Sequence, residues 1–251
     1  FFNKFSKNIF HNIESAFPQN LESEKFLKKL NVKKVNRIGN LKFCETKNQK
    51  KIQLKSDFLL SIKNRLIFCA SSTHLGEEDQ IAKTHLILKK KYKNLLTIII
   101  PRHVERMEEI YNNLLSLDLK TIIRTSNKKI NPNTDIYLVD TYGETENFFR
   151  FCKIVFLGGS LINRGGQNPL EPARQGCKIL HGPNISNFRE IYNLLDKYKI
   201  SSKVNNQNKL YSNLRIILKK NVSSEKLIYK LKKLGNTILY STLLEVKKFI
   251  N

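Results

Sequence analysis

The segment 158–172 carries more groups suited to chemistry than any other in this sequence. It reads GGSLINRGGQNPLEP and follows an apolar, strand-like segment, 153–157. Asn168 and Pro169 are residue types that cap and begin helices, so we expect a helix to start there. A glycine loop before a helix presents backbone N–H groups and a positive helix dipole to a phosphate, although many such loops are only tight turns. Glu171, one turn further on, is expected to accept hydrogen bonds from sugar hydroxyls.

Three more polar clusters follow apolar segments. The segment 71–78 combines hydroxyls, an imidazole and a helix start, which suit a phosphate or carboxylate, or simply form a Ser/Thr helix cap. Arg102, in 101–103, can hold an anion through two parallel hydrogen bonds, or lie on the surface after a strand-ending proline. The segment 140–144 offers a further ligand loop or an ordinary capped turn. Each cluster is weak alone, but four at successive strand ends indicate one site.

The elements that must position these clusters alternate along the chain. Predicted strands cover 66–71, 95–101, 121–124, 136–139, 153–157 and 178–180, and predicted helices cover 77–92, 104–117, 144–151, 170–175 and 188–198. Short apolar strands separated by helices indicate an α/β fold with a parallel sheet covered on both faces. Such a sheet binds its ligand at the carboxyl ends of its strands, where the four clusters lie.

The two ends of the chain differ from this central part. Residues 1–44, with a helix at 22–30, are expected to be the end of a preceding N-terminal domain and the interdomain junction, and the lysine-rich segment 45–56 a linker. Residues 57–251 are the predicted C-terminal domain. It closes with two basic amphipathic helices near 208–220 and 224–249, the second interrupted around Gly235.

The formal net charge of +24 invites a polyanionic partner, and from Lys197 onward thirteen Lys or Arg face two acids. Nucleic acid, anionic lipid and a phosphorylated glycolipid all fit this charge. An overall enrichment in Lys, Asn and Ile accounts for at least half of the excess. Since no nucleic-acid-binding motif accompanies it, no nucleic-acid partner is predicted. No apolar run approaches the ~20 residues that a membrane-spanning helix needs.

The sequence lacks the motifs that are typical of other catalytic and cofactor-binding sites. The five histidines have no metal-ligand spacing, and the four cysteines form no CxxC pair. The sequence also has no GxSxG, GxxxxGK[ST] or GxGxxG motif. We therefore predict neither a metal nor a cofactor.

In order and spacing, the segments 39–43, 71–77, 101–103, 140–144, 158–172 and 182–188 resemble those of the 3-deoxy-D-manno-octulosonic acid (Kdo) transferases. This family belongs to the GT-B glycosyltransferases. The resemblance implies two facing Rossmann-like domains, of which the C-terminal one binds the donor CMP-Kdo. It also implies metal-independent transfer of Kdo to lipid IVA, the lipid A precursor of lipopolysaccharide, at the cytoplasmic face of the bacterial inner membrane. The basic tail helices then either touch the anionic membrane surface or cross back to the first domain.

The resemblance assigns roles residue by residue. The residues that it places against CMP-Kdo are Pro101, Arg102, Tyr142, Gly143, Glu144, Asn168, Pro169, Leu170 and Glu171, with Ser72, Thr73, His74, Gly159 and Ser160 as further candidates. Lys42 matches a lysine proposed to stabilise the transition state, where a cation beside the departing phosphate is physically sensible. Gln167 replaces a common His, and Tyr142 a common Met.

The family's general base is a glutamate of the N-terminal domain, which does not precede Phe1 in this sequence. A missing general base costs roughly 10²–10⁴-fold in rate, so we expect the chain alone to bind donor weakly and transfer little. Two alternatives stay open. One is a GT-B transferase for another nucleotide sugar, and the other is a non-catalytic, basic polyanion-binding module.

Overall fold

The computed structural model describes residues 2–44, 56–219 and 224–250. Its contacts divide the chain into two compact units, which we call the N-terminal unit (Phe1–Asn48 with Tyr229–Asn251) and the sheet unit (Gln49–Ile228). The predicted linker, 45–56, lies outside the described residues except for Ser56. The predicted domain boundaries therefore stay a prediction.

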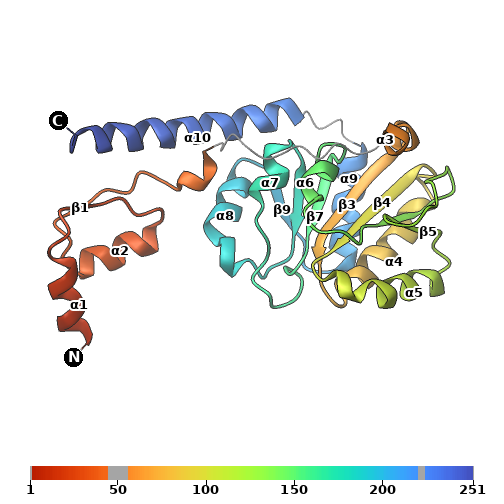
Figure 1. Ribbon diagram of the computed structural model, residues 1–251, viewed down its shortest axis with the longest axis horizontal. Helices are drawn as coiled ribbons and strands as arrows, with labels where there is room; N and C mark the ends of the chain where they lie inside the picture. The colour runs from red at the N-terminus through yellow and green to blue at the C-terminus, as the bar shows by residue number, and fades with distance from the viewer. Residues whose placement is uncertain (1, 45–55, 220–223, 251) are drawn as a thin grey trace. The chain divides into compact units, whose positions relative to one another are not determined.

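The sheet unit contains seven parallel strands in the order β5-β6-β4-β3-β7-β8-β9 (Figure 1). Their bounds are β3 Leu66–Thr73, β4 Leu95–Pro101, β5 Thr121–Ile123, β6 Ile136–Leu138, β7 Ile154–Leu157, β8 Lys178–His181 and β9 Ser201–Lys203. From β3 the chain continues to its neighbour β4, then to β5 at the outer edge and back to β6 between β4 and β5, and it finally crosses to place β7 on the other side of β3. Strand order thus reverses between β3 and β7, where doubly wound sheets bind their ligands.

Helices cover both faces of the sheet (Figure 1). Their bounds are α3 Ser56–Ile62, α4 Glu77–Lys89, α5 Met107–Ser116, α6 Thr145–Phe149, α7 Leu170–Arg174, α8 Arg189–Lys197 and α9 Gln207–Lys219. Ile81 of α4, Ile110 of α5 and Leu210 of α9 share one buried apolar cluster with strand residues such as Ala70. On the opposite face the ring of Phe58 in α3 lies 5.3 Å from Tyr137 and 5.7 Å from Phe148 of α6, measured between centroids.

Six of the seven strands match the predicted segments to within two residues at either end, because each is an apolar run buried on both faces. The sequence analysis missed β9 and α3. Strand β9 has the sequence Ser-Ser-Lys, which carries no apolar pattern, and it forms at the sheet edge by pairing with β8. Parallel pairing supplied by a neighbour does not depend on the strand's own hydrophobicity.

The N-terminal unit begins with α1 Phe2–Phe10, β1 Ser15–Ala16, α2 Leu21–Lys29, β2 Lys34–Val35 and the 3₁₀ helix η1 Leu41–Phe43. Strands β1 and β2 pair in parallel. Asn20 caps α2, since its Oδ1 accepts a hydrogen bond of 2.7 Å from the Ser23 N–H. The helix predicted over 22–30 is therefore confirmed.

Helix α10, Ser224–Lys247, corrects one prediction, because it runs without interruption through Gly235. Gly235 does not end the helix but allows another backbone segment to pack closely against it. A Cβ atom at this position would lie 2.5 Å from the Phe43 carbonyl oxygen. The Cys44 Sγ–H also donates to the Gly235 carbonyl at 3.3 Å. A helix breaker in the sequence is thus a point of close backbone approach in the fold.

Candidate functional site

The four polar clusters found in the sequence follow four adjacent strands, β6, β4, β3 and β7. All four strands are parallel and paired in register, so their carboxyl ends lie side by side at one end of the sheet, which we call the strand-end edge. Three strand spacings separate the first of these ends from the last, a width of about 14 Å. The fold therefore brings the four predicted clusters together, as the sequence analysis required.

Backbone hydrogen bonds hold the ends of β3, β4 and β7 against one another. The Arg102 N–H donates to the Thr73 carbonyl at 2.9 Å, and the Gly158 N–H donates to the Ser71 carbonyl at 2.8 Å. A Cβ atom on Gly158 would lie 2.3 Å from the Ser72 carbonyl oxygen, so only glycine fits there.

The first amides of the glycine loop already hold an anion, the carboxylate of Glu77. This side chain is fully buried and accepts hydrogen bonds from the N–H groups of Gly159 (2.7 Å), Ser160 (3.2 Å), Leu161 (3.0 Å) and His74 (3.0 Å). Burial raises the pKa of Glu77, and the four N–H groups counteract that rise. These amides were expected to face a phosphate, so this part of the phosphate-binding interpretation is corrected.

Ser160, a further candidate ligand, is committed to the structure. Its hydroxyl bonds the Leu157 carbonyl and accepts the Gly182 N–H at 2.8 Å. Its carbonyl accepts the Asn184 N–H at 2.9 Å. These contacts tie the loops after β7 and β8 together, so the Ser160 side chain has no group to spare for a ligand in this arrangement.

The second part of the glycine loop leads into α7 as predicted. The structure begins α7 at Leu170, with Pro169 rather than Asn168 at the N-cap position, and Asn168 Oδ1 accepts the Leu170 N–H at 3.1 Å from just before the helix. The Asn168 side-chain amide also donates to Glu171 Oε1 at 3.4 Å. Because α7 is only five residues long, its dipole is small, and the side chains of Asn168 and Glu171 are the stronger ligand groups here.

The pKa of the Glu171 carboxyl is raised, mainly by burial and further by the nearby Glu146 carboxylate. Glu171 remains only partly buried, so its carboxylate is accessible to hydroxyl donors at the sheet edge. Glu171 is the second residue of α7, and its role as an acceptor for sugar hydroxyls stays a prediction.

The loop after β6 contains two main candidate residues, of which Glu144 is held by contacts within the protein and Tyr142 is exposed. Glu144 is nearly buried, pairs with Arg124 Nη2 at 3.1 Å and accepts the Thr141 hydroxyl. Tyr142 is 62% exposed, and its hydroxyl donates to Glu105 Oε1 at 2.9 Å. The tyrosine ring therefore bridges the loops after β6 and β4 while leaving most of its surface to a ligand. Gly143 between them has φ +80°, which favours glycine.

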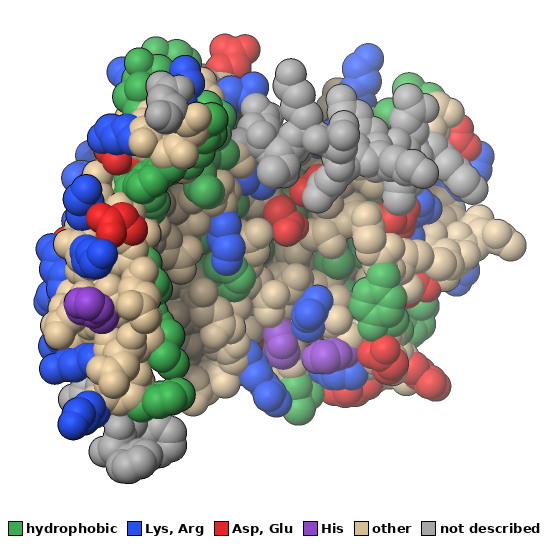
Figure 2. Space-filling view, turned by 60° about the vertical axis from the view of Figure 1, so that its left-hand side comes forward, with side chains coloured by type: hydrophobic (Ala, Val, Ile, Leu, Met, Phe, Trp, Pro, Cys, Tyr) green, Lys and Arg blue, Asp and Glu red, His purple; other side chains and the backbone are tan. Residues whose placement is uncertain are grey.

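Positively charged and imidazole side chains gather near the centre of the edge. Arg102 and His103 are exposed, and the His103 ring centroid lies 5.7 Å from that of His74 in a T-shaped arrangement. Two neighbouring histidines flanked by Lys or Arg side chains are visible on this face of the sheet unit (Figure 2). No individual role is predicted for His103 or Arg164 from the sequence, although they belong to the predicted segments 101–103 and 158–172.

Lys42, the predicted transition-state stabiliser, lies in η1 of the N-terminal unit. Its N–H donates to Asn40 Oδ1 at 2.9 Å, and Asn40 is itself buried. Asn40 thus fixes the backbone that carries the lysine. The role of the Lys42 side chain stays a prediction.

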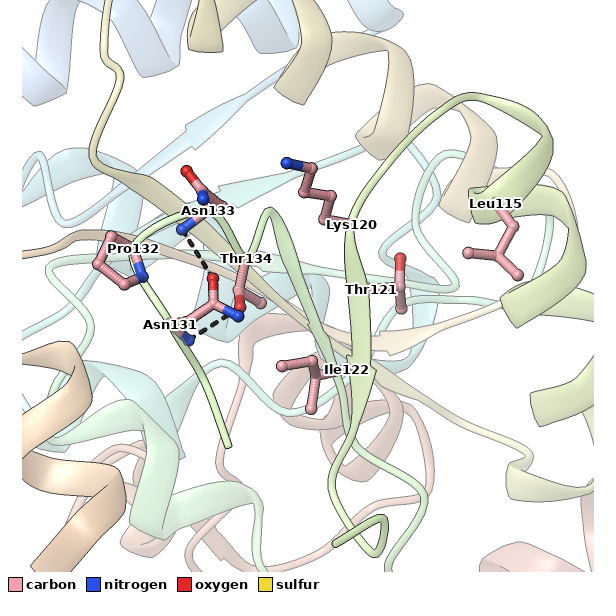
Figure 3. Close-up of a pocket in the computed structure, with 8 residues that line it drawn as sticks. All are labelled: Leu115, Lys120, Thr121, Ile122, Asn131, Pro132, Asn133 and Thr134. Atoms are coloured by element: carbon pink, nitrogen blue, oxygen red, sulfur yellow. Dashed lines mark hydrogen bonds between the residues drawn. The ribbon is translucent and has the colours of Figure 1, made fainter. Parts of the chain in front are cut away.

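A separate depression of about 430 Å³ lies away from the strand-end edge (Figure 3). Its lining residues are Leu115, Lys120, Thr121, Ile122, Asn131, Pro132, Asn133 and Thr134. They come from the end of α5, the start of β5 and the segment before β6, so this depression opens at the end of the sheet opposite the four clusters. No predicted site residue lines it.

Within the described residues, no group of three His, Cys, Asp or Glu side chains is arranged to hold a metal ion. None of the described helices is both long and apolar enough to cross a membrane.

No protein-family model matches the chain. The chain is 37% identical over 164 residues to a 3-deoxy-D-manno-octulosonic acid transferase of Haemophilus influenzae, an alignment that covers 64% of this chain and 38% of that protein. It is 31% identical over 229 residues to the enzyme of the same name from Rickettsia bellii, covering 88% of this chain and 54% of that protein. The chain thus spans about half the length, or less, of these curated relatives.

Among solved structures, the chain is similar to the C-terminal CMP-Kdo binding domain of WaaA from Acinetobacter baumannii. The TM-score is 0.66 at 26% identity, and the match covers 71% of this chain and 94% of that domain. Together with the seven-stranded parallel sheet, this match confirms the predicted α/β, Rossmann-like fold of a GT-B donor domain.

Proposed function

The chain is homologous to the C-terminal, donor-binding portion of the 3-deoxy-D-manno-octulosonic acid transferases, and from this premise we propose that it supplies the CMP-Kdo site of a Kdo transferase. The glycosyltransferase would move Kdo from CMP-Kdo to lipid IVA in lipopolysaccharide assembly. The observation that carries the proposal is the convergence of four polar loops at one sheet edge, in a fold shared with a CMP-Kdo binding domain.

The donor site would use the loops in distinct ways. The exposed guanidinium of Arg102, after Pro101, is free of hydrogen bonds and ion pairs to other described residues and would pair with an anionic group of the donor. The Tyr142 ring would lie against the nucleotide, with Gly143 giving the turn and Glu144 holding it through Arg124.

The start of α7 would hold the sugar of the nucleotide. Glu171 would accept ribose hydroxyls, and the Asn168 amide, already 3.4 Å from Glu171, would orient that carboxylate. Pro169 and Leu170 would contribute the turn and its backbone rather than a side-chain contact. Ser72, Thr73 and Gly159 would form the base of the donor site at the carboxyl ends of β3 and β7.

In the transfer itself, the acceptor hydroxyl oxygen would bond to the anomeric carbon of Kdo while the bond from that carbon to the phosphate oxygen breaks. CMP would leave with the electron pair, and Lys42 would stabilise its negative charge. The proton of the acceptor hydroxyl would pass to a glutamate general base in the N-terminal part of the family's fold. This scheme needs no metal.

The remaining partners follow from the same proposal. Lipid IVA is an anionic glycolipid, and the Lys-rich face of α10 would favour the anionic membrane surface in which it resides. We accordingly propose the cytoplasmic face of the bacterial inner membrane as the site of action.

Calorimetric titration of the 251-residue chain with CMP tests the donor site. We expect saturable binding that weakens at least about tenfold in Arg102→Ala and in Glu171→Ala, since each removes a charge-assisted hydrogen bond. Arg150→Ala, an exposed arginine at the end of α6, is the matched control and should bind CMP normally.

Two other results would identify the alternatives. Tighter binding of UDP or GDP than of CMP would indicate another nucleotide-sugar transferase. No binding of any nucleotide, combined with retention on heparin that falls steeply with salt, would indicate a polyanion-binding module.

A further inference from the structure

His74, His103 and Arg164 come from three different loops and meet where the strand order reverses. His74 follows β3, His103 follows β4, and Arg164 lies in the glycine loop after β7. The family resemblance assigns no role to His103 or Arg164. Their convergence is a property of the fold, since the three segments are far apart in the sequence.

The members of this cluster lie close to one another. A Cβ atom on Gly159 would lie 3.1 Å from His74 Cε1 and 3.4 Å from Arg164 Cβ, so both residues border the same point. Gly159 has φ +64°, which favours glycine, and a side chain there would crowd both residues. The His103 ring centroid lies 5.7 Å from that of His74.

The imidazole of His74 is held in one orientation. Its Nδ1 lies 3.0 Å from the Ser72 carbonyl oxygen, a pure acceptor, so Nδ1 carries hydrogen and Nε2 is left for another partner. The Ser72 backbone that positions it has φ +55°. His103, by contrast, is exposed.

The cluster has more positive than negative charge available. Burial lowers the pKa of His74, and His103 and Arg164 lower it further, whereas the Ser72 carbonyl and Glu78 act to raise it. The nearby carboxylates are engaged, Glu77 by four N–H groups and Glu78 by Arg106 at 3.0 Å. Arg164 makes no side-chain hydrogen bond or ion pair to any residue of 2–44, 56–219 or 224–250.

We propose that His74, His103 and Arg164 form an oxyanion subsite that binds one of the two anionic groups of the donor, its phosphate or its sugar carboxylate. The proposal rests on the proposed function for the identity of the donor. Arg164 supplies fixed charge and N–H donors, and each imidazole becomes a second cationic donor when it takes up a proton. The subsite distinguishes an acidic donor from cytidine alone.

Titrations of the 251-residue chain with cytidine, CMP and freshly prepared CMP-Kdo test this subsite. In Arg164→Gln, and further in Arg164→Gln with His103→Gln, we expect CMP-Kdo to bind at least about tenfold more weakly while cytidine binding is unchanged. Both residues are exposed, so the fold should persist, and Arg150→Gln controls for the lost charge.

Comparison of CMP with CMP-Kdo shows whether the subsite binds the phosphate or the sugar carboxylate of the donor. A loss that already appears with CMP assigns the subsite to the phosphate, and a loss confined to CMP-Kdo assigns it to the sugar carboxylate. Variants that bind all three ligands as the unaltered chain does, or that lose cytidine equally, would overturn the subsite.

Inorganic phosphate separates failure of the subsite from failure of the proposed function. If the unaltered chain binds neither CMP nor CMP-Kdo, the proposed function is wrong, and the subsite is tested by imidazole NMR with phosphate. The imidazole resonances of His74 and His103 should then shift on titration with phosphate, and should shift less in Arg164→Gln. Unshifted resonances in the unaltered chain would refute the subsite as well.

Discussion

Glu77 accepts a hydrogen bond of 2.7 Å from the Gly159 N–H, across 82 residues of sequence. The contact joins the start of α4 to the glycine loop after β7. An internal carboxylate thus occupies amides that, in a glycine loop, commonly bind a ligand phosphate. Under the proposed function, the donor would therefore be held by side chains around this loop rather than by its first amides.

Glu77→Gln should destabilise the sheet unit strongly. Glutamine keeps the side-chain length but turns an NH₂ group toward backbone N–H donors, which breaks at least one hydrogen bond to a charged group and leaves a buried donor unpaired. We expect a loss of about 2–4 kcal/mol in the free energy of unfolding, measured by urea denaturation. Glu108→Gln, on an exposed position in the first turn of α5, should change it by less than about 0.5 kcal/mol. Equal midpoints for the two variants would contradict a structural role for Glu77.

Asp135 should make stability depend on acid pH. Although burial acts to raise its pKa, the His85 imidazole, with Nε2 3.5 Å from Oδ1, the Lys89 ammonium and the Lys120 N–H bring the value to about 2. Because the folded pKa is below the ordinary value of 3.8, this stabilisation is present above pH ~4 and is lost as pH falls through about 2. The full contribution is about 2 kcal/mol.

Asp135→Asn tests this dependence by urea denaturation at several pH values. The variant should be less stable at pH 6 and should lose less stability between pH 4 and 2 than the unaltered chain does. Asp118→Asn is the control, since asparagine tolerates the left-handed backbone at that exposed position. An unchanged slope in Asp135→Asn would contradict the assignment.

Gly158 and Gly76 should differ sharply in their tolerance of alanine. A Cβ on Gly158 would meet backbone at 2.3 Å, whereas a Cβ on Gly76 has nothing within 4 Å and suffers only from its φ of +87°. We expect Gly76→Ala to cost about 1–2 kcal/mol and Gly158→Ala appreciably more. The measurement is again the free energy of unfolding. A smaller cost at Gly158 would mean that β3 and β7 separate easily there.

Gly235→Ala should destabilise α10, although a glycine-to-alanine substitution in a helix interior usually stabilises the helix. Alanine ordinarily gains about 1 kcal/mol over glycine in a helix. Here its methyl group would lie 2.5 Å from the Phe43 carbonyl oxygen and force the chain around Phe43 away. Asn236→Ala, at the next and exposed position, should show the ordinary gain. Thermal unfolding of both variants provides the comparison, and stabilisation by Gly235→Ala would argue against the close approach.

Local sequence patterns determined most of the sheet unit. Strands such as β4 and β7 are apolar runs that cannot be solvated, and the loops after them begin with Pro101 or Gly158, which end regular structure. The rule that parallel strands bind ligands at their carboxyl ends then located the candidate site before any coordinates. The start of a helix near Asn168 and Pro169 was predictable to within one residue, since it depends only on neighbours in the sequence.

Only the tertiary structure decided which groups at that edge are free to bind. Glu77 looked like an ordinary first-turn acid of a helix, and Gly235 looked like a helix break. Their actual contacts join segments that are remote in sequence, and strand order, rather than local periodicity, brings those segments within hydrogen-bonding distance. The same reason applies to His103 and Arg164, whose meeting with His74 depends on β4 and β7 flanking β3.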